Sequence, residues 1–333
     1  MLSVSLFLVA AILSAQDLRI GTIEFLGLRK VSEEQIRSVL GLREGDTIPM
    51  DSPGEWLQKY QKRIEGIPGV VRASISARCC DGAGKAALTV SILEEGSPSV
   101  TFRPVPTCSV RLPKEIIETY HRFTTAWEHA VRIGDNEDNI EEGHSLMANA
   151  DVREIQREFI TLARKHFAVL RTVLRDSAAD EHRTAAAWTL GYAPDKAAVV
   201  DDLVHAVSDA SEEVRNNAAR AVWAIATLST RKPELGIHIP VGPFIELLNS
   251  IVWSDRNKAL AVLGEITRDR PPATMTQLRQ HALAALVEMA RRRDGATAYL
   301  LLGRIAGIPE EQITETWNRE EREKVIAKLL RGE

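Results

Sequence analysis

The chain has 333 residues, 44% of them apolar and 26% charged, which is typical of a soluble globular protein and excludes a largely disordered one. Its net charge is −4 with both signs interspersed, so it lacks the concentrated basic face that usually marks a nucleic-acid-binding protein. The length accommodates one to three domains, each able to bury its own core.

The N-terminal residues have the pattern of a secretion signal. An apolar run from Leu6 to Leu13 precedes small and polar residues, and it is shorter than the roughly 20 residues of a membrane-spanning helix. We therefore predict a signal peptide over residues 1–16 and export to the periplasm or cell envelope. The alternative is a buried strand or helical turn. No other segment of the sequence is long and apolar enough to cross a membrane.

Residues 17–96 predict a small α+β domain with the element order β-α-α-β-β. Ser32 and Gln35 have the spacing of a capping box, which indicates the start of the first helix. Gly27 ends the first strand, where a positive φ or a close backbone approach is expected. Apolar and polar residues then alternate in two later segments, as in strands with one buried face. The predicted strands cover residues 19–25, 70–78 and 86–94, and the second helix covers residues 53–64.

This order and spacing resemble the POTRA domain, a periplasmic module that handles other polypeptides. The family pattern has an apolar-x-apolar-x-Gly start, a Gly-x-x-x-x-Val link into the hairpin and an acidic end to the last strand. Those positions are held here by Ile23, Phe25, Gly27, Gly66, Val71 and Glu94. The sequence departs from the pattern at Leu28, where Asn is common. The resemblance implies binding of polypeptides and no catalytic group.

A three-stranded sheet has two edges, and an edge strand offers unpaired N–H and C=O groups. We predict that the strand beginning at Val70 accepts an extended peptide by β-augmentation. Arg72 and Arg78 would favour acidic segments. The alternative is that residues 97–108 or a repeat helix cover this edge. The candidate binding residues are Val70, Val71, Arg72, Ala73, Ser74, Ile75 and Ser76.

Three cysteines cluster within residues 79–108, without the spacing of a metal site. Cys79 and Cys80 are neighbours on a strand, so their side chains point to opposite faces. We predict one disulfide, which joins Cys108 to either Cys79 or Cys80, and one remaining thiol.

The segment after the first domain is rich in proline and predicts an extended linker over residues 97–113. A helical connector is expected over residues 114–150. Helical periodicity continues to Leu330. It predicts long helices over residues 113–133 and 151–174, with a loop at 134–143.

The helical region repeats itself with a period of 32 or 33 residues. The elements of the unit are a first helix that ends in Asp, then an Arg that opens an Ala-rich second helix. This pattern is similar to HEAT repeats, which stack helix pairs into an α-solenoid. We predict such repeats over residues 151–333, against the alternative of an irregular helical bundle. The matching pairs are Leu170 and Leu203, Leu174 and Val207, Asp176 and Asp209, Arg183 and Arg215, Ala186 and Ala218, and Leu190 and Val222.

Two kinds of side chain in the repeats are predicted to be structural. Arg183 and Arg215 are expected to pair with Asp176 or Asp209 as an Asp/Arg ladder along the stack. The tryptophans fall on apolar helix faces and are expected in the core. They are Trp56, Trp127, Trp188, Trp223, Trp253 and Trp317.

The sequence carries no catalytic or metal-binding motif that we recognise, and we predict no cofactor. We therefore expect a non-catalytic protein-interaction scaffold of the periplasm or cell envelope, with a role in envelope or outer-membrane protein assembly. One alternative is a metal-dependent HEAT-repeat enzyme, although the His-Glu dipeptides of one such group are missing. Another is a membrane-anchored, divisome-like scaffold with an uncleaved N-terminus.

Overall fold

The structure is a computed structural model that describes residues 18–49, 53–78 and 84–331. It divides into two compact units, Met1–Ser97 and Pro98–Glu333. The predicted signal peptide and the cysteines Cys79 and Cys80 lie outside the described residues. Each unit is taken separately below.

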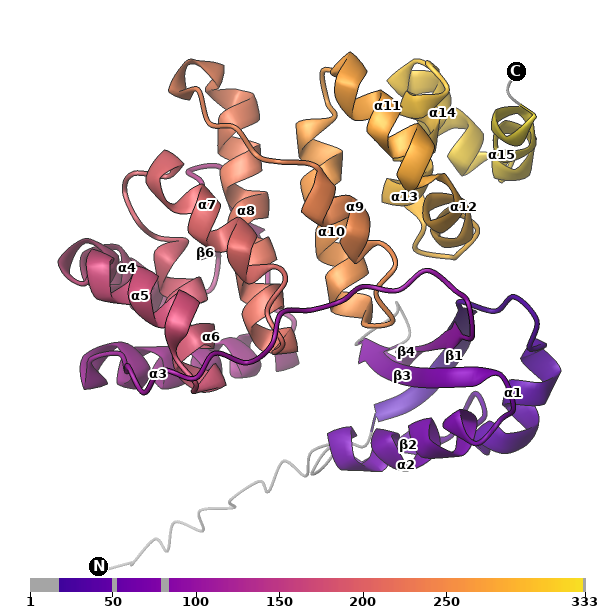
Figure 1. Cartoon of the computed structure of the whole chain (residues 1–333), viewed down its shortest axis with the longest axis horizontal. Helices are drawn as coiled ribbons and strands as arrows, with labels where there is room; N and C mark the ends of the chain where they lie inside the picture. Colours follow the sequence, from indigo (N-terminus) through magenta and orange to yellow (C-terminus); the bar gives the residue numbers. More distant parts are fainter. Residues whose placement is uncertain (1–17, 50–52, 79–83, 332–333) are drawn as a thin grey trace, which may run out of the picture. The chain divides into compact units, whose positions relative to one another are not determined.

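The first unit is a mixed four-stranded sheet with two helices on one face (Figure 1). The strand order is β2-β1-β4-β3, in which β4 runs parallel to β1 and antiparallel to β3. The three predicted strands are confirmed. The structure adds β2, which has two residues and is too short to give a sequence period. The elements are β1 (Leu18–Leu26), α1 (Glu33–Leu40), β2 (Thr47–Ile48), α2 (Pro53–Glu65), β3 (Val70–Arg78) and β4 (Ala86–Glu94).

The core of this unit lies between the sheet and the two helices. The predicted capping box is present: Ser32 accepts from the N–H of Gln35, whose side chain accepts from the N–H of Ser32. It fixes the start of α1 and turns Ile36 and Leu40, both fully buried, toward the sheet.

Gly27 allows the chain to leave β1 close to the neighbouring strand. Its φ is +83°, and a Cβ atom there would lie 1.9 Å from the carbonyl oxygen of Ile92 on β4. No other residue fits that position without displacing the backbone of β4. The expectation of a close approach at Gly27 is thus confirmed.

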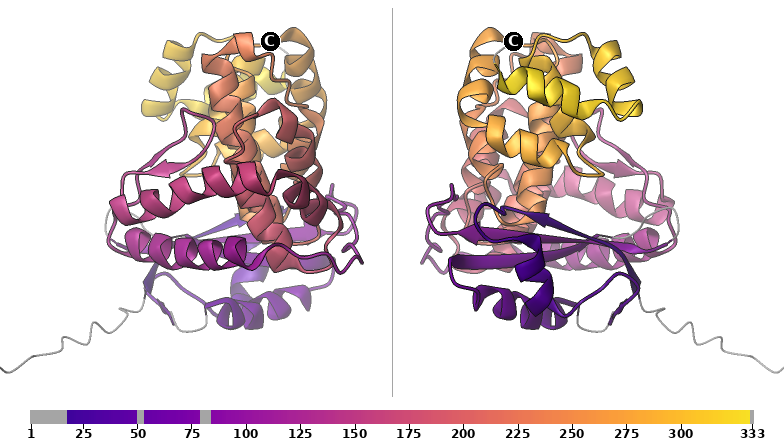
Figure 2. Two further views of the ribbon diagram at one scale, coloured as in Figure 1. Left: turned by 90° about the vertical axis from the view of Figure 1, so that its left-hand side faces the viewer. Right: turned by 90° about the vertical axis from the view of Figure 1, so that its right-hand side faces the viewer.

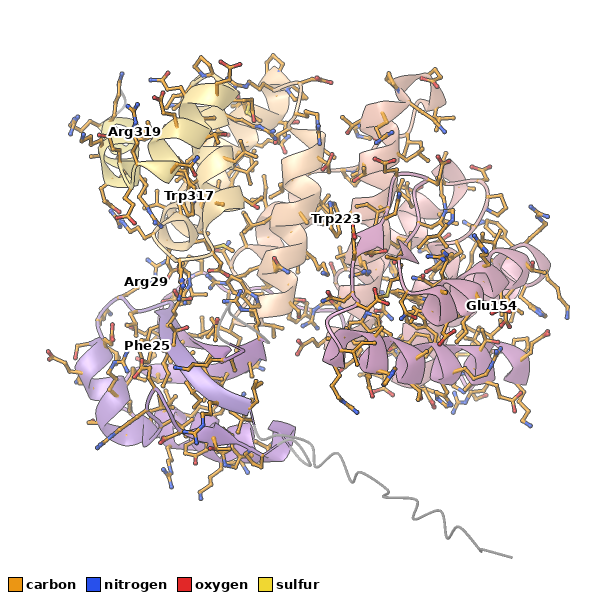
Figure 3. All side chains as sticks on the ribbon, turned by 180° about the vertical axis from the view of Figure 1, so that it is seen from behind. Phe25, Arg29, Glu154, Trp223, Trp317 and Arg319 are labelled. Carbon is orange, nitrogen blue, oxygen red and sulfur yellow. The ribbon has the colours of Figure 1, made fainter. Side chains whose placement is uncertain are left out.

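Glu94, at the end of β4, fastens the loop that follows Gly27. Glu94 is 3% exposed, and its carboxylate accepts hydrogen bonds from three successive backbone N–H groups. The distances are 2.7 Å to Arg29, 2.8 Å to Lys30 and 3.1 Å to Val31. Arg29 is labelled in Figure 3. Burial raises the pKa of Glu94, but the three N–H groups outweigh it, so the pKa lies below that of an ordinary glutamate.

The second unit is helical, and its helices pair and stack side by side in chain order (Figure 1). At its N-terminal end, α3 and α4 lie against each other (Figure 2). The elements are α3 (Lys114–Arg132), β5 (Asp138–Asn139), β6 (Leu146–Met147), α4 (Ala150–Lys165), α5 (Phe167–Asp176), α6 (Asp180–Leu190), α7 (Ala197–Ala206), α8 (Glu212–Arg231), the 3-10 turn η1 (Pro233–Leu235), α9 (Gly242–Leu247), α10 (Trp253–Ile266), α11 (Pro272–His281), α12 (Leu283–Ala290), α13 (Ala296–Ile305), α14 (Glu310–Asn318) and α15 (Arg322–Leu330).

Two sequence predictions in this unit need correction. The single helix expected over residues 151–174 is two helices, α4 and α5. They are separated at His166, whose φ of −114° and ψ of 22° break the helix without any proline or glycine signal. The loop expected at 134–143 contains β5, which forms a short hairpin with β6, and these two-residue strands are too brief to show alternation.

Buried arginines join successive helix pairs. Arg183 donates two hydrogen bonds of 2.9 Å to Asp209, and a third of 2.8 Å to the carbonyl of Ser177. Arg215 repeats this geometry one unit later, with two 2.9 Å bonds to Asp255 and one to the carbonyl of Asp209. Each guanidinium therefore donates to a carbonyl of the turn before its own helix and to a carboxylate of the next repeat.

The predicted ladder is right for Arg183, which pairs with Asp209, and wrong for Arg215, which pairs with Asp255. The sequence period could not indicate this partner. Between α8 and α10 an insertion lengthens the repeat. The carboxylate that pairs with Arg215 therefore comes from the start of α10 and not from the turn before it. Ser250 occupies the turn position instead and donates a 2.7 Å hydrogen bond to Asp255.

The predicted linker is extended, and its backbone lies against the helix turns of its own unit. The N–H of Cys108 donates to the carbonyl of Asp176 at 3.1 Å, and its carbonyl accepts from Ala178 at 2.7 Å. One repeat later, the N–H of Arg103 donates to the carbonyl of Ser208 at 2.8 Å. Residues 98–112 therefore form a strap across successive repeats.

Replacing Glu94 by Gln is expected to lower the free energy of unfolding by about 2 kcal/mol. The neutral amide of glutamine cannot accept hydrogen bonds from three N–H groups as a carboxylate does. The stabilisation is present above the ordinary glutamate pKa and is lost as pH falls through the lowered folded pKa. The gap between wild type and variant in chemical denaturation should therefore narrow below about pH 4. Glu95→Gln, at an exposed neighbour, is the control. Equal stability of the two variants would contradict this role.

Replacing Arg183 by Met is expected to cost about 3–5 kcal/mol, because Asp209 stays buried without its partner. The matched control is Arg122→Met. It breaks an ion pair with Glu158 whose side chains are 53% and 42% exposed, and it should cost no more than about 1 kcal/mol. Thermal and urea unfolding of both variants measure the difference. Similar losses would show that the ladder contributes no more than a surface ion pair.

Candidate interaction surfaces

In the first unit, β3 is an outer strand of the sheet, because it pairs with β4 alone in the strand order. Its side chains alternate, with Ala73 and Ile75 buried. Val71, on the same strand, is 51% exposed. The structure thus places the predicted binding strand at a sheet edge.

The direction of the main-chain groups on β3 follows from one hydrogen bond. The N–H of Ala73 donates to the carboxylate of Glu65 on α2 at 3.1 Å, so it points away from β4. In an antiparallel pair this direction alternates, and Ile75 and Ala77 therefore also present their N–H groups outward. Ser74 and Ser76 point theirs toward β4. Glu65 covers one donor of the edge, a common way to blunt an edge strand.

The two arginines of this strand differ in their surroundings. Arg72 is exposed. Arg78 lies 3.9 Å from Glu24 on β1, on the face of the sheet. Of the two, only Arg72 fits the sequence-based expectation of an arginine available to an acidic partner.

In the second unit, α3 and α8 both contact α6 and leave a groove of about 190 Å³ over it. Each wall is a helix stripe with the spacing i, i+3, i+4, i+7, and Trp188 of α6 also lines the groove. The α3 wall consists of Tyr120, Phe123, Thr124 and Trp127, and the α8 wall of Glu213, Asn216, Asn217 and Arg220.

An aromatic cluster supports the groove. Trp188 stacks on Phe123 with ring centroids 4.3 Å apart. Asn217 donates to the hydroxyl of Tyr120 at 3.0 Å and so bridges the two walls. Trp127 is 38% exposed, which corrects the expectation that it is core. Trp188 and Trp253 are each 7% exposed, in agreement with it.

The hairpin of β5 and β6 places carboxylates along α8. Asp138 pairs with Arg220, and Glu141 pairs with Arg231. Beyond the end of α8, Lys232 lies 3.6 Å from Glu142. The basic side of α8 thus already holds one acidic segment of the same chain.

Two lysines of this unit have lowered pKa values, and they differ in their partners. Burial lowers the pKa of Lys196 to about 7, and its ammonium donates to the carbonyl of Gly191 at 2.6 Å. Burial also lowers the pKa of Lys258 on α10 to about 8. Lys258 has no hydrogen bond or ion pair with any residue that the structure describes. Its ammonium lies 5.9 Å from the ring centre of Trp223, on the side of α8 that faces α10 (Figure 3).

No metal centre is found among the described residues: they contain no group of three or more His, Cys, Asp or Glu side chains placed to hold an ion. Histidines pair singly, as His121 does with Glu181 at 2.7 Å. Cys108 is exposed, and because its predicted partners lie outside the described residues, the disulfide stays a prediction. Within the same described part of the chain, no helix has the length and apolar character to span a membrane.

Comparison with known proteins agrees with the repeated helix pairs. The sequence profile of HEAT repeats matches residues 167–235, which run from α5 to η1. The helical unit therefore contains HEAT-like repeats. No curated protein matches the chain. The resemblance of residues 17–96 to a POTRA domain stays a prediction.

Proposed function

We propose that this protein is a non-catalytic scaffold that binds other polypeptides in the periplasm or cell envelope. The observation that carries the proposal is β3, an outer strand with an exposed Val71 and main-chain donors that point away from the sheet. An extended peptide adds to such an edge through main-chain hydrogen bonds. The POTRA resemblance of the same unit supports this mode of binding.

The added strand would pair with the outward groups of Ile75 and Ala77. It would also displace the carboxylate of Glu65 from the N–H of Ala73. Main-chain pairing gives affinity with little sequence preference, and Arg72 would favour partners with nearby acidic residues. The HEAT-like unit supplies a second surface, as stacked helical repeats commonly do.

Export is the second part of the proposal, and it is motivated by the apolar run that precedes β1. The mature protein is expected to begin near Gln16 or Asp17 and to fractionate outside the cytoplasm. N-terminal sequencing of the protein from its native host measures this. Intact Met1 on soluble cytosolic protein would contradict it.

Blocking the outward edge of β3 should abolish partner binding without unfolding the unit. Ser74 is unsuitable for this test, because its N–H points toward β4. Ala77 is exposed and points its N–H outward, so Ala77→Pro removes an edge donor where proline is tolerated. A photo-crosslinker at position 71 is expected to capture a polypeptide partner in the native compartment, with yield reduced at least about tenfold by Ala77→Pro.

Ala77→Val is the matched control, since it alters the same side chain but keeps the N–H. Circular dichroism and thermal unfolding establish that both variants fold. A folded Ala77→Pro variant that crosslinks as well as Ala77→Val would show that the edge is not the binding site.

A further inference from the structure

The strap of residues 98–112 is bound to two successive repeats by more than its main-chain pairs with their turns (Figure 1). At its C-terminal end, the N–H of Leu112 donates a hydrogen bond of 2.9 Å to Nδ1 of His182 on α6. One repeat further, the guanidinium of Arg103 donates to Nε2 of His205 on α7 and, at 2.8 Å, to the main-chain carbonyl of the same residue. A histidine ring therefore accepts a hydrogen bond from the strap in each of the two repeats.

The donors of these two contacts fix the protonation of both rings. A backbone N–H and a guanidinium can only donate, so the ring nitrogen opposite them must accept. Nδ1 of His182 and Nε2 of His205 are thus unprotonated while the strap is bound, and each neutral ring carries its one proton on the other nitrogen. A second proton can bind only at the nitrogen that accepts from the strap. Protonation of either ring therefore replaces an acceptor by a donor and breaks that contact.

The groups around His205 oppose its protonation. Burial lowers its pKa most, and the guanidinium of Arg103 lowers it further, followed by that of Arg175 on α5. The carboxylates of Asp202 and Asp209 raise the pKa. Asp202 already pairs with Arg175, and Asp209 is part of the buried ladder. A charged ring at this position would therefore lie directly against the guanidinium of the strap.

His182 has similar surroundings. Burial lowers its pKa most, and Arg111 of the strap lowers it further, whereas Glu181 raises it. Glu181 already pairs with His121 of α3 at 2.7 Å. In each repeat the strap thus supplies a cation that disfavours the charged ring. Because such coupling is reciprocal, protonation of the ring must disfavour the bound strap.

We propose that residues 98–112 form an acid-releasable strap, which is bound to the helix turns while His182 and His205 are neutral and is released when both rings are protonated. Release turns a bound segment into a free tether between the two units. It also uncovers the main-chain groups of Asp176, Ala178 and Ser208, with which the strap pairs. The inference concerns regulation, and it does not depend on what β3 binds.

The direction and size of the effect follow from the two histidines. Because both pKa values are lowered in the bound state, their contribution is fully present above the ordinary histidine pKa of about 6.5. It is lost as pH falls from there to the lowered values. At pH 5 each ring can weaken the binding of the strap by up to about 30-fold.

The test is hydrogen–deuterium exchange of the whole protein, measured by mass spectrometry at pH 7.5 and pH 5. Rates are corrected for the intrinsic pH dependence of amide exchange. We expect the protection of residues 98–112 to fall at least about tenfold at pH 5, while peptides from α8 stay protected. Equal loss of protection in α8 would overturn the proposal, because the repeats would then unfold together with the strap.

A double variant keeps both acceptors and removes both titrations. The amide oxygen of asparagine can replace Nδ1 in His182→Asn, and that of glutamine can replace Nε2 in His205→Gln. The strap of this variant should be equally protected at the two pH values. His238→Gln, at an exposed position in the segment before α9, is the matched control and should keep the pH dependence of the wild type.

A second measurement follows the same coupling from the histidine. Titration by NMR should show that Arg103→Gln raises the pKa of His205, because the variant removes the guanidinium beside the ring. An unchanged pKa would overturn the proposal. So would strap protection that does not depend on pH in the wild type, or a pH dependence that survives in the folded double variant. Neither measurement involves a partner of β3, so failure here is distinguishable from failure of the proposed function.

Discussion

The second unit depends on arginines that are buried between successive helix pairs. A guanidinium presents several N–H groups in a fixed plane, so Arg183 and Arg215 can each bind a carboxylate of the next repeat and a carbonyl of their own turn. Removing one member of such a pair would leave the other as a buried charge without its partner, which is strongly destabilising. The strap of residues 98–112 uses the same turns, and the ring of Phe102 lies 3.7 Å from the guanidinium carbon of Arg215.

A different constraint organises the first unit. Gly27 permits contact with the carbonyl of Ile92, and Glu94 then binds the loop that enters α1. The sheet is thereby fixed at the end of β4, its central strand, while β3 remains on the outside. Rigid support beneath an accessible edge suits a strand that pairs with a partner, since little order must then be gained on binding.

Much of this fold follows from sequence patterns with a physical cause. Alternation gave the bounds of β3 and β4, and the capping residues gave the start of α1. The repeat period indicated the helix pairs and limited the expected partner of Arg183 to Asp176 or Asp209. Features that depend on tertiary contacts could not be predicted from the sequence. They include the break at His166, the pairing of Arg215 across an insertion, the outward direction of the Ala77 N–H, and the groove, whose two walls are distant in sequence. Lys258 carried no local signal, because its environment comes from Trp223 and Arg220.

We propose that this chain binds linear polypeptide segments through the open sheet edge at β3. The most direct test is selection of random linear peptides displayed on phage against the immobilised whole protein. We expect the enriched peptides to lose binding with Ala77→Pro and to keep it with Ala77→Val. Enrichment of no linear peptide above background would contradict it.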